Sequence, residues 1–130
     1  MLPLRYPRVW VALGWLLVLG VILGSLLPAP VIREITPPIS DKLEHFGAYF
    51  VLMVWFAGLY PRAKHLHIAV ALVVLGTVLD ILQGTATQTR SFELLDIAAD
   101  AVGIIVALVL SARLFEGWCQ RVERLAARSA

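Results

Sequence analysis

The sequence predicts an all-α membrane protein, a bundle of four transmembrane helices, and three observations favour this fold class. Of its 130 residues, 60% are hydrophobic and only 15% are charged, whereas soluble domains carry about 25% charged residues. The mean hydropathy is +0.85. Four apolar segments of membrane-spanning length follow one another, and none alternates with the period of two that a membrane β-barrel strand requires. We expect a single membrane domain over residues 1–130.

The first predicted span, residues 9–27, lies within a segment that contains no charged residue as far as position 32. A transmembrane helix needs about 20 apolar residues, so this segment is long enough. Arg5 and Arg8 precede it, as basic residues precede the core of a signal peptide. Signal-peptide cores are only about 7–15 residues long, so we expect this helix to remain in the mature protein. Pro28 and Pro30 are expected to end it.

The second predicted span covers residues 41–60. Pro37 and Pro38 keep the connection before it extended, and Ser40 is a good N-cap residue. A tight polar turn that begins at Pro61 and contains two basic residues is expected to follow.

The third predicted span, residues 66–82, is interrupted only by Thr77 and Asp80. Residues 84–93 are polar and include three threonines, so they are predicted to form a loop.

The fourth predicted span covers residues 94–115, with Ser91 as the expected cap. Residues 116–130 mix apolar and basic side chains. This pattern predicts a short amphipathic helix along the cytoplasmic surface of the membrane.

The distribution of basic residues predicts the orientation. With a cytoplasmic N-terminus, eight of the eleven Lys and Arg residues flank the spans on the inner side, namely Arg5, Arg8, Arg62, Lys64, Arg113, Arg121, Arg124 and Arg128. Cytoplasmic loops carry an excess of such residues, so both termini are expected in the cytoplasm. The outer side keeps Arg33, Lys42 and Arg90.

The ionisable residues within the spans all lie near the outer side. They are found at the start of the second span, at the end of the third and at the start of the fourth. A transporter or a proton channel usually needs polar groups along its whole length, so this arrangement favours a pocket at one depth.

Helical spacing pairs these side chains, because residues three or four positions apart share a face. Asp41 and His45 form one pair, and Asp96 and Asp100 form another. Gly103 continues the second stripe as a small residue that allows a neighbouring helix to approach closely. First-turn carboxylates can also simply complement the helix dipole, and a histidine beside them is more often a buried hydrogen-bonding residue than a ligand.

Asp80 lies near the C-terminal end of its span, where an anion is unfavourable and needs a cationic partner. Arg90 is the expected partner. By contrast, His65, His67 and Cys119 are expected to have no part in the site, and the single cysteine excludes an internal disulfide.

Four motifs occur in a fixed order along residues 38–110: Asp41-Lys42-Leu43-Glu44-His45-Phe46, Asp80-Ile81-Leu82-Gln83, Arg90-Ser91, and Asp96 followed by Asp100-Ala101-Val102-Gly103. Their order and spacing resemble the VanZ-like family of small membrane proteins. Family patterns usually show Glu where this chain has Asp80 and Asn where it has Asp100, so the pocket of this chain gains a negative charge.

The resemblance implies a four-helix, multi-pass protein of the cytoplasmic membrane and cell envelope, in a family whose founding member is linked to glycopeptide (teicoplanin) resistance. Carried over residue by residue, it singles out the pocket candidates Asp41, Lys42, His45, Asp80, Gln83, Arg90, Asp96 and Asp100.

Three functions remain open. The first, which we favour because no nucleophile with an adjacent base is visible, is binding of a lipid-linked envelope precursor or a glycopeptide in an outward-facing pocket. The second is a membrane-embedded enzyme that uses His45 and carboxylates, with or without a divalent metal, on a lipid-linked envelope substrate. The third is a structural partner in a membrane complex. None of these patterns specifies catalytic residues or an oligomeric state.

Charge limits the ligands of this pocket. Six acidic residues at the outer side against two basic ones give a charge near −4, which favours a cation or shared protons. No cofactor motif is evident, although a divalent metal is compatible with these donors. The net charge of the chain is only +2 and its basic residues are dispersed, which argues against nucleic-acid binding.

Overall fold

The computed structural model of the chain describes residues 1–26, 41–86 and 94–129, and the regular structure within these ranges is helical. The elements are α1 (Pro7–Leu26), α3 (Asp41–Leu59), the 3₁₀ turn η1 (Arg62–Lys64), α4 (His65–Ala86), α5 (Leu94–Arg113) and α6 (Trp118–Ser129). The expected caps Ser40 and Ser91 lie outside the described residues.

Three of these segments are long and apolar enough to cross a membrane: α1, the segment Arg62–Gln83, and α5. The sequence predicts four spans, and α3 is the one that does not meet this criterion. The reason is chemical, since α3 begins with four ionisable residues within five positions. Length and composition therefore support a multi-pass membrane protein with three candidate spans among the described residues.

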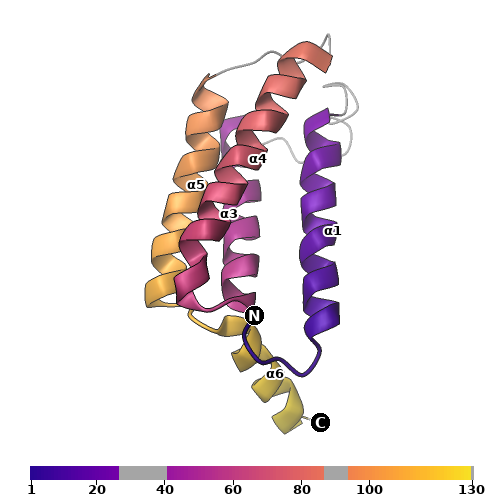
Figure 1. Cartoon of the computed structure of the whole chain (residues 1–130), viewed down its shortest axis with the longest axis vertical. Helices are drawn as coiled ribbons and strands as arrows, with labels where there is room; N and C mark the ends of the chain where they lie inside the picture. The colour runs from indigo at the N-terminus through magenta and orange to yellow at the C-terminus, as the bar shows by residue number, and fades with distance from the viewer. Residues whose placement is uncertain (27–40, 87–93, 130) are drawn as a thin grey trace.

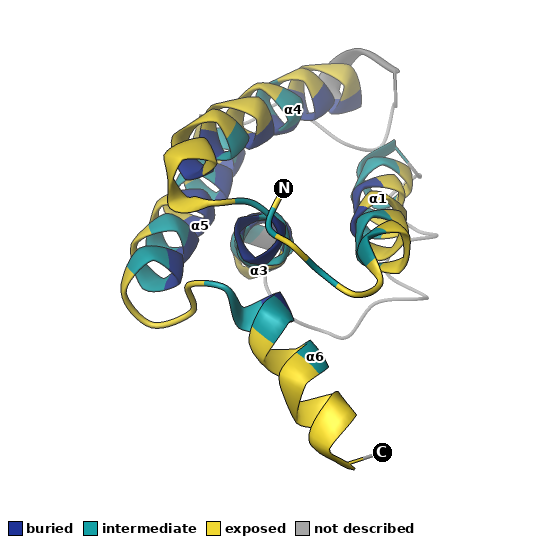
Figure 2. Ribbon diagram, turned by 60° about the horizontal axis from the view of Figure 1, so that its bottom comes forward, coloured by how far each residue is buried: buried dark blue, intermediate teal, exposed yellow. Residues whose placement is uncertain are grey.

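Helix α3 occupies the centre of the bundle. Helices α1, α3, α4 and α5 lie side by side (Figure 1), and α3 stands in the middle, with α1, α4, α5 and α6 around it (Figure 2). It packs on all four of them. A central position surrounds the side chains of α3 with protein, and this is where polar residues of a membrane helix are tolerated.

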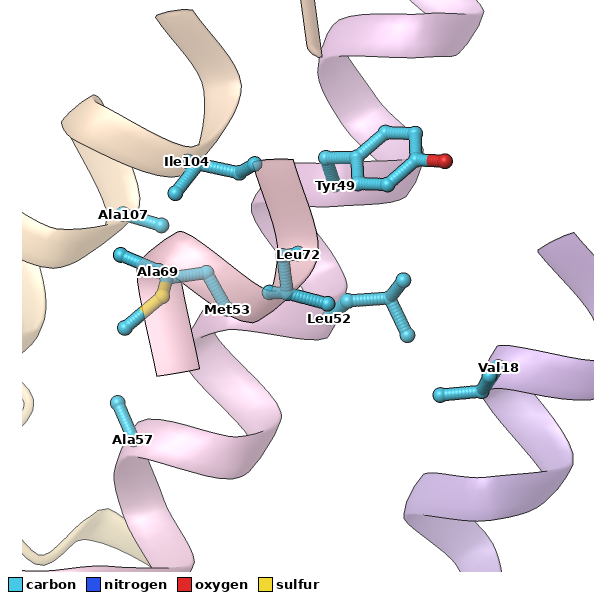
Figure 3. Packing of buried hydrophobic residues seen from close by; sticks show 9 residues of the cluster. All are labelled: Val18, Tyr49, Leu52, Met53, Ala57, Ala69, Leu72, Ile104 and Ala107. Atoms are coloured by element: carbon cyan, nitrogen blue, oxygen red, sulfur yellow. The ribbon is translucent and has the colours of Figure 1, made fainter. Parts of the chain in front are cut away.

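The apolar core lies between α3 and its neighbours. Figure 3 shows its nine buried residues, Val18, Tyr49, Leu52, Met53, Ala57, Ala69, Leu72, Ile104 and Ala107. Large apolar side chains also point outward from α1, α4 and α5, including Leu16, Val70 and Ile105, each more than half exposed. Such outward apolar faces fit contact with lipid.

Helices α3 and α5 approach each other closely at Gly103. A Cβ atom on Gly103 would fall well inside the van der Waals distance of the Phe46 carbonyl oxygen and 3.2 Å from the Phe46 Cα. The expectation that a small residue at this position admits a neighbouring helix is therefore confirmed. This contact brings the first turns of α3 and α5 together.

Helix α4 extends further than the sequence predicts. It continues to Ala86, so the assignment of residues 84–86 to a loop is wrong. Glycine in a helix costs only about 1 kcal/mol relative to alanine. Asp80 and Gln83, both buried in the preceding turn, hold this end of the helix against the bundle.

The two chain termini meet at one end of the molecule. The Glu123 carboxylate on α6 accepts hydrogen bonds from the amides of Arg5 (2.7 Å) and Tyr6 (3.0 Å) and from the Trp10 indole (2.8 Å). We call this set of contacts the terminal clasp. Nearby, the Trp118 indole donates to the Val54 carbonyl on α3 at 2.8 Å. The clasp thus fixes α6 and the chain start against the centre of the bundle.

The clasp is expected to weaken in acid. Partial desolvation opposes ionisation of Glu123, but the amides of Arg5 and Tyr6 and the Trp10 indole favour the charged form and hold the pKa of Glu123 below its ordinary value of 4.5. A lowered folded-state pKa contributes stability that is present above pH 4.5 and is lost as the pH falls through the folded-state pKa. The protection of the α6 amides against hydrogen exchange, measured relative to the intrinsic exchange rate at each pH, should fall over this acid range.

The matched variants are Glu123→Gln and Glu116→Gln. In Glu123→Gln the α6 amides should be less protected than in the wild type at pH 7, and their protection should change little in acid, because the neutral amide cannot replace the carboxylate. Glu116→Gln removes a carboxylate at the same end and should behave like the wild type. Equal exchange in all three proteins would show that the clasp does not hold α6.

Candidate functional site

Five ionisable side chains from three helices meet near the end of the bundle at which α3 and α5 begin. In Figure 1 this end lies opposite the chain termini. We call these five side chains the polar cluster: Lys42 and His45 on α3, Asp80 on α4, and Asp96 and Asp100 on α5. Their positions follow from the fold, because α3 and α5 begin at this end and α4 ends here.

His45 is the centre of the polar cluster. Its Nδ1 is hydrogen-bonded to the Asp100 Oδ1 at 2.8 Å, and the Asp80 Oδ1 lies 3.8 Å from the same nitrogen. The second ring nitrogen, Nε2, is 3.8 Å from the Asp96 Oδ2. Each ring nitrogen of this buried histidine therefore faces a carboxylate.

Lys42 forms the outer edge of the cluster. Its ammonium group donates to the Asp96 Oδ1, and its side chain is 39% exposed whereas that of Asp96 is 5% exposed. Lys42 thus connects a buried carboxylate with the surface, because a long lysine side chain can keep its charged end near water.

Asp80 and Asp100 are almost completely buried, at 2% exposure each. Within the ranges that the structure describes, the Oδ2 atom of each has no hydrogen-bond partner. The Asp100 Oδ2 lies 2.8 Å from the position that a Cβ on Gly76 would occupy. Gly76 precedes Asp80 on α4 by one helical turn. Because Gly76 has no side chain, the Asp100 carboxylate of α5 can pack against α4 at this point.

Tyr49 is a neighbour of the cluster that the sequence does not single out. It is buried, and its ring lies 3.2 Å from the same Cβ position on Gly76. The available signal is its spacing, four residues after His45 and therefore on the same face of α3. Tyr49 thus belongs to the apolar core (Figure 3) and also lies beside the polar cluster, because its ring and the Asp100 carboxylate both approach Gly76.

The remaining pocket candidates are placed only in part. Gln83 is buried on α4, three residues after Asp80. Asp41 begins α3, but its side chain is not among those described, and Arg90 lies outside the described residues. The pairing of Arg90 with Asp80 therefore stays a prediction.

Two residues expected to be uninvolved have structural roles. His65 is buried, and its Nε2–H donates to the carbonyl oxygens of Ala57 at 2.9 Å and Tyr60 at 3.1 Å. It thereby satisfies carbonyl groups that the end of α3 leaves without helical partners. Cys119 is buried, and this burial, together with the charge of Glu123, raises the pKa of the thiol to about 12. At neutral pH this cysteine is an unreactive packing residue.

The polar cluster has the composition of a cation or proton site. Three carboxylates surround one imidazole and are opposed by one ammonium group. Such a set can bind a cation, share a proton between His45 and Asp100, or hydrogen-bond a polar ligand that displaces Lys42.

Comparison with known proteins gives one relative of undescribed function. An uncharacterized protein of Schizosaccharomyces pombe is 34% identical over 100 residues, which are 74% of this chain and 57% of the yeast protein. The chain thus spans somewhat more than half the length of the curated relative that it matches. No family model matches the sequence, and no solved structure matches it.

Proposed function

We propose that this chain is a VanZ-like protein of the cell membrane with four spans, in which α3 is the fourth. Two observations support the fourth span. Helix α3 is nearly as long as its neighbours and lies among them, and His45, the last ionisable residue of its start, is buried against Asp80 of α4 and Asp100 of α5. The ordered motifs of the VanZ-like pattern also supply all five residues of the polar cluster from three separate segments: Lys42 and His45, Asp80, and Asp96 with Asp100.

Both termini are proposed to be cytoplasmic, with the polar cluster at the outer side. The contacts of Gln120 with Pro3 and of Glu123 with Arg5 hold the two ends of the chain together, which an even number of spans requires. The basic residues of η1 and of α6 lie at this same end, and an excess of Lys and Arg favours the cytoplasmic side.

The proposed activity is recognition of an envelope component, a lipid-linked precursor or a glycopeptide, at the polar cluster. The observation that carries this proposal is the convergence of donors and acceptors from α3, α4 and α5 on His45, with Lys42 at the edge. The cluster lies at one end of the bundle, which is the depth of lipid head groups. Lys42 supplies a cation for a phosphate, and the carboxylates supply acceptors for hydroxyl or amino groups.

The 2.8 Å contact between His45 and Asp100 favours a second candidate, an enzyme that transfers a proton to or from a lipid-linked substrate. A histidine oriented by a carboxylate is a common general base. The two candidates differ in whether Asp100 must carry a charge, and Asp100→Asn therefore discriminates between them.

The test is glycopeptide resistance in a teicoplanin-sensitive bacterial host that expresses the chain. His45→Ala and Asp100→Ala are expected to abolish the gain in resistance while membrane abundance, measured by immunoblot, stays close to that of the wild type. His67→Ala removes an exposed histidine of α4 and is expected to retain full resistance. Retained resistance in Asp100→Asn would support binding, whereas its loss at normal abundance would support proton transfer.

A purely structural role for the polar cluster predicts a different pattern. Resistance would then fall only in proportion to the remaining protein in every variant. No resistance from the wild-type chain itself would contradict recognition of a glycopeptide.

A further inference from the structure

Three helices each contribute one metal-ligating side chain to a single buried point. A nitrogen of His45 on α3 and carboxylate oxygens of Asp80 on α4 and Asp100 on α5 all lie within 4.8 Å of one another. Ligands bind zinc at about 2.0–2.2 Å, so two donors on one ion are separated by at most about 4 Å. Side-chain movements of about 1 Å or less would bring these three donors around one ion.

The unpartnered oxygens of the cluster are an independent indication of a ligand. The Oδ2 atoms of Asp80 and Asp100 are buried and have no hydrogen-bond partner in the described part of the chain. Buried carboxylates are normally paired, hydrogen-bonded or coordinated to a metal, because desolvation of an uncompensated charge is very unfavourable. Both side chains are about 98% buried, since their exposure is only 2%.

The charge of the described side chains favours a divalent cation. With neutral His45 and ionised carboxylates, the five described side chains of the polar cluster carry three negative charges and one positive charge. Lys42 neutralises Asp96, so the excess belongs to Asp80 and Asp100. One divalent cation would bring the charge of the polar cluster to zero, whereas an anion would increase the imbalance.

We propose that His45, Asp80 and Asp100 bind one divalent transition-metal ion, with Zn²⁺ or Mn²⁺ preferred to Mg²⁺ or Ca²⁺. Imidazole suits transition metals, while Mg²⁺ and Ca²⁺ favour sites made of oxygen alone. His45 would bind through Nδ1, the nitrogen nearest both carboxylates. Its Nε2–H then points toward Asp96, which Lys42 holds in place.

The Asp96 arrangement agrees with known metal chemistry. A metal-bound histidine almost always donates its other N–H to a carboxylate or carbonyl, which fixes the ring and raises its basicity. Asp96 is therefore assigned as a positioning residue for His45. Metal binding is a separate proposal from recognition of an envelope component. Either proposal can be wrong while the other is right.

The experiment is isothermal titration of Zn²⁺ into chelator-treated protein in detergent, with Mg²⁺ as the comparison ion. We expect one Zn²⁺ per chain, a higher unfolding temperature in the bound form and much weaker Mg²⁺ binding. His45→Ala and Asp80→Asn should lower Zn²⁺ affinity by about 100-fold or more, because even outer carboxylates contribute about 10–100-fold. Glu44→Gln and His67→Ala, which alter residues outside the three, should bind as the wild type does.

X-ray absorption of the Zn²⁺-loaded wild type provides a measurement that needs no variant to fold. We expect the Zn²⁺ ion to be coordinated by one imidazole and by oxygen ligands, with no sulfur. The metal site would be overturned by any of three results: no stoichiometric Zn²⁺ binding, a Zn²⁺ coordination shell without imidazole, or unchanged Zn²⁺ affinity in His45→Ala and Asp80→Asn. The resistance assay is scored separately, so Zn²⁺ binding without resistance would reject the proposed envelope ligand alone.

Discussion

Replacing Gly103 by alanine is expected to separate α3 from α5 and to destabilise the whole bundle. The added Cβ would overlap the Phe46 carbonyl oxygen and lie 3.1 Å from the Phe46 carbonyl carbon. Both are backbone atoms, so no side-chain rotation relieves the overlap and the two helices must move apart. Overpacking typically costs about 1–3 kcal/mol, and we expect the upper end or more because backbone has to shift.

Gly47→Ala is the matched control. Gly47 lies next to Phe46 on α3, and a Cβ there would meet no atom within 4 Å. This variant should be neutral or gain up to about 1 kcal/mol from the helix propensity of alanine. The unfolding temperature of both variants is measured in detergent. Unfolding is monitored as the loss of the monodisperse protein peak on heating. Equal unfolding temperatures for the two would contradict the close approach of α3 and α5.

Moving α3 from α5 also disturbs the polar cluster, because the Gly103 contact and the pair of His45 with Asp100 join the same two helices. Metal or ligand binding should therefore fall in Gly103→Ala even in the fraction that stays folded. The geometry of the candidate site depends on a residue that touches none of its donors.

The lengths of the apolar segments are sufficient to predict the helices. The polar residues at the ends of these segments are sufficient to predict which residues form the polar cluster. Asp96 and Asp100 share a face at a spacing of four, and a buried carboxylate in a membrane helix has to face protein. The sequence could not predict that α3 lies at the centre. That position depends on which faces of the other helices pack inward, and their apolar residues cover all sides nearly evenly.

Contacts between segments distant in the chain escaped prediction for the same reason. Glu123 binds amides more than 100 positions earlier, and Tyr49 reaches the cluster only because α4 carries Gly76 opposite it. His65 caps α3 across a turn whose geometry the sequence does not specify. Each depends on the packed arrangement of helices and not on a local pattern.

Lys42→Met is expected to destabilise the protein more than Asp96→Asn does, although the two residues form one ion pair. Loss of Lys42 removes the ammonium group from the buried carboxylate of Asp96, whose side chain is only 5% exposed. Removing one partner of a fully buried pair costs about 3–5 kcal/mol, and we expect about 1–3 kcal/mol here because the Lys42 side chain is 39% exposed. Loss of the Asp96 charge leaves a lysine that can turn to water.

The double variant Lys42→Met/Asp96→Asn decides whether this asymmetry has the stated cause. Once Asp96 is neutral, loss of the ammonium group no longer leaves a buried charge, so the double variant should recover most of the stability lost in Lys42→Met. Chemical denaturation in mixed micelles gives the four free energies of unfolding, and their cycle should show a coupling well above the scatter of about 0.3–0.5 kcal/mol seen for independent sites. Additive losses would mean that the methylene groups of Lys42, and not its charge on Asp96, stabilise this end of the bundle.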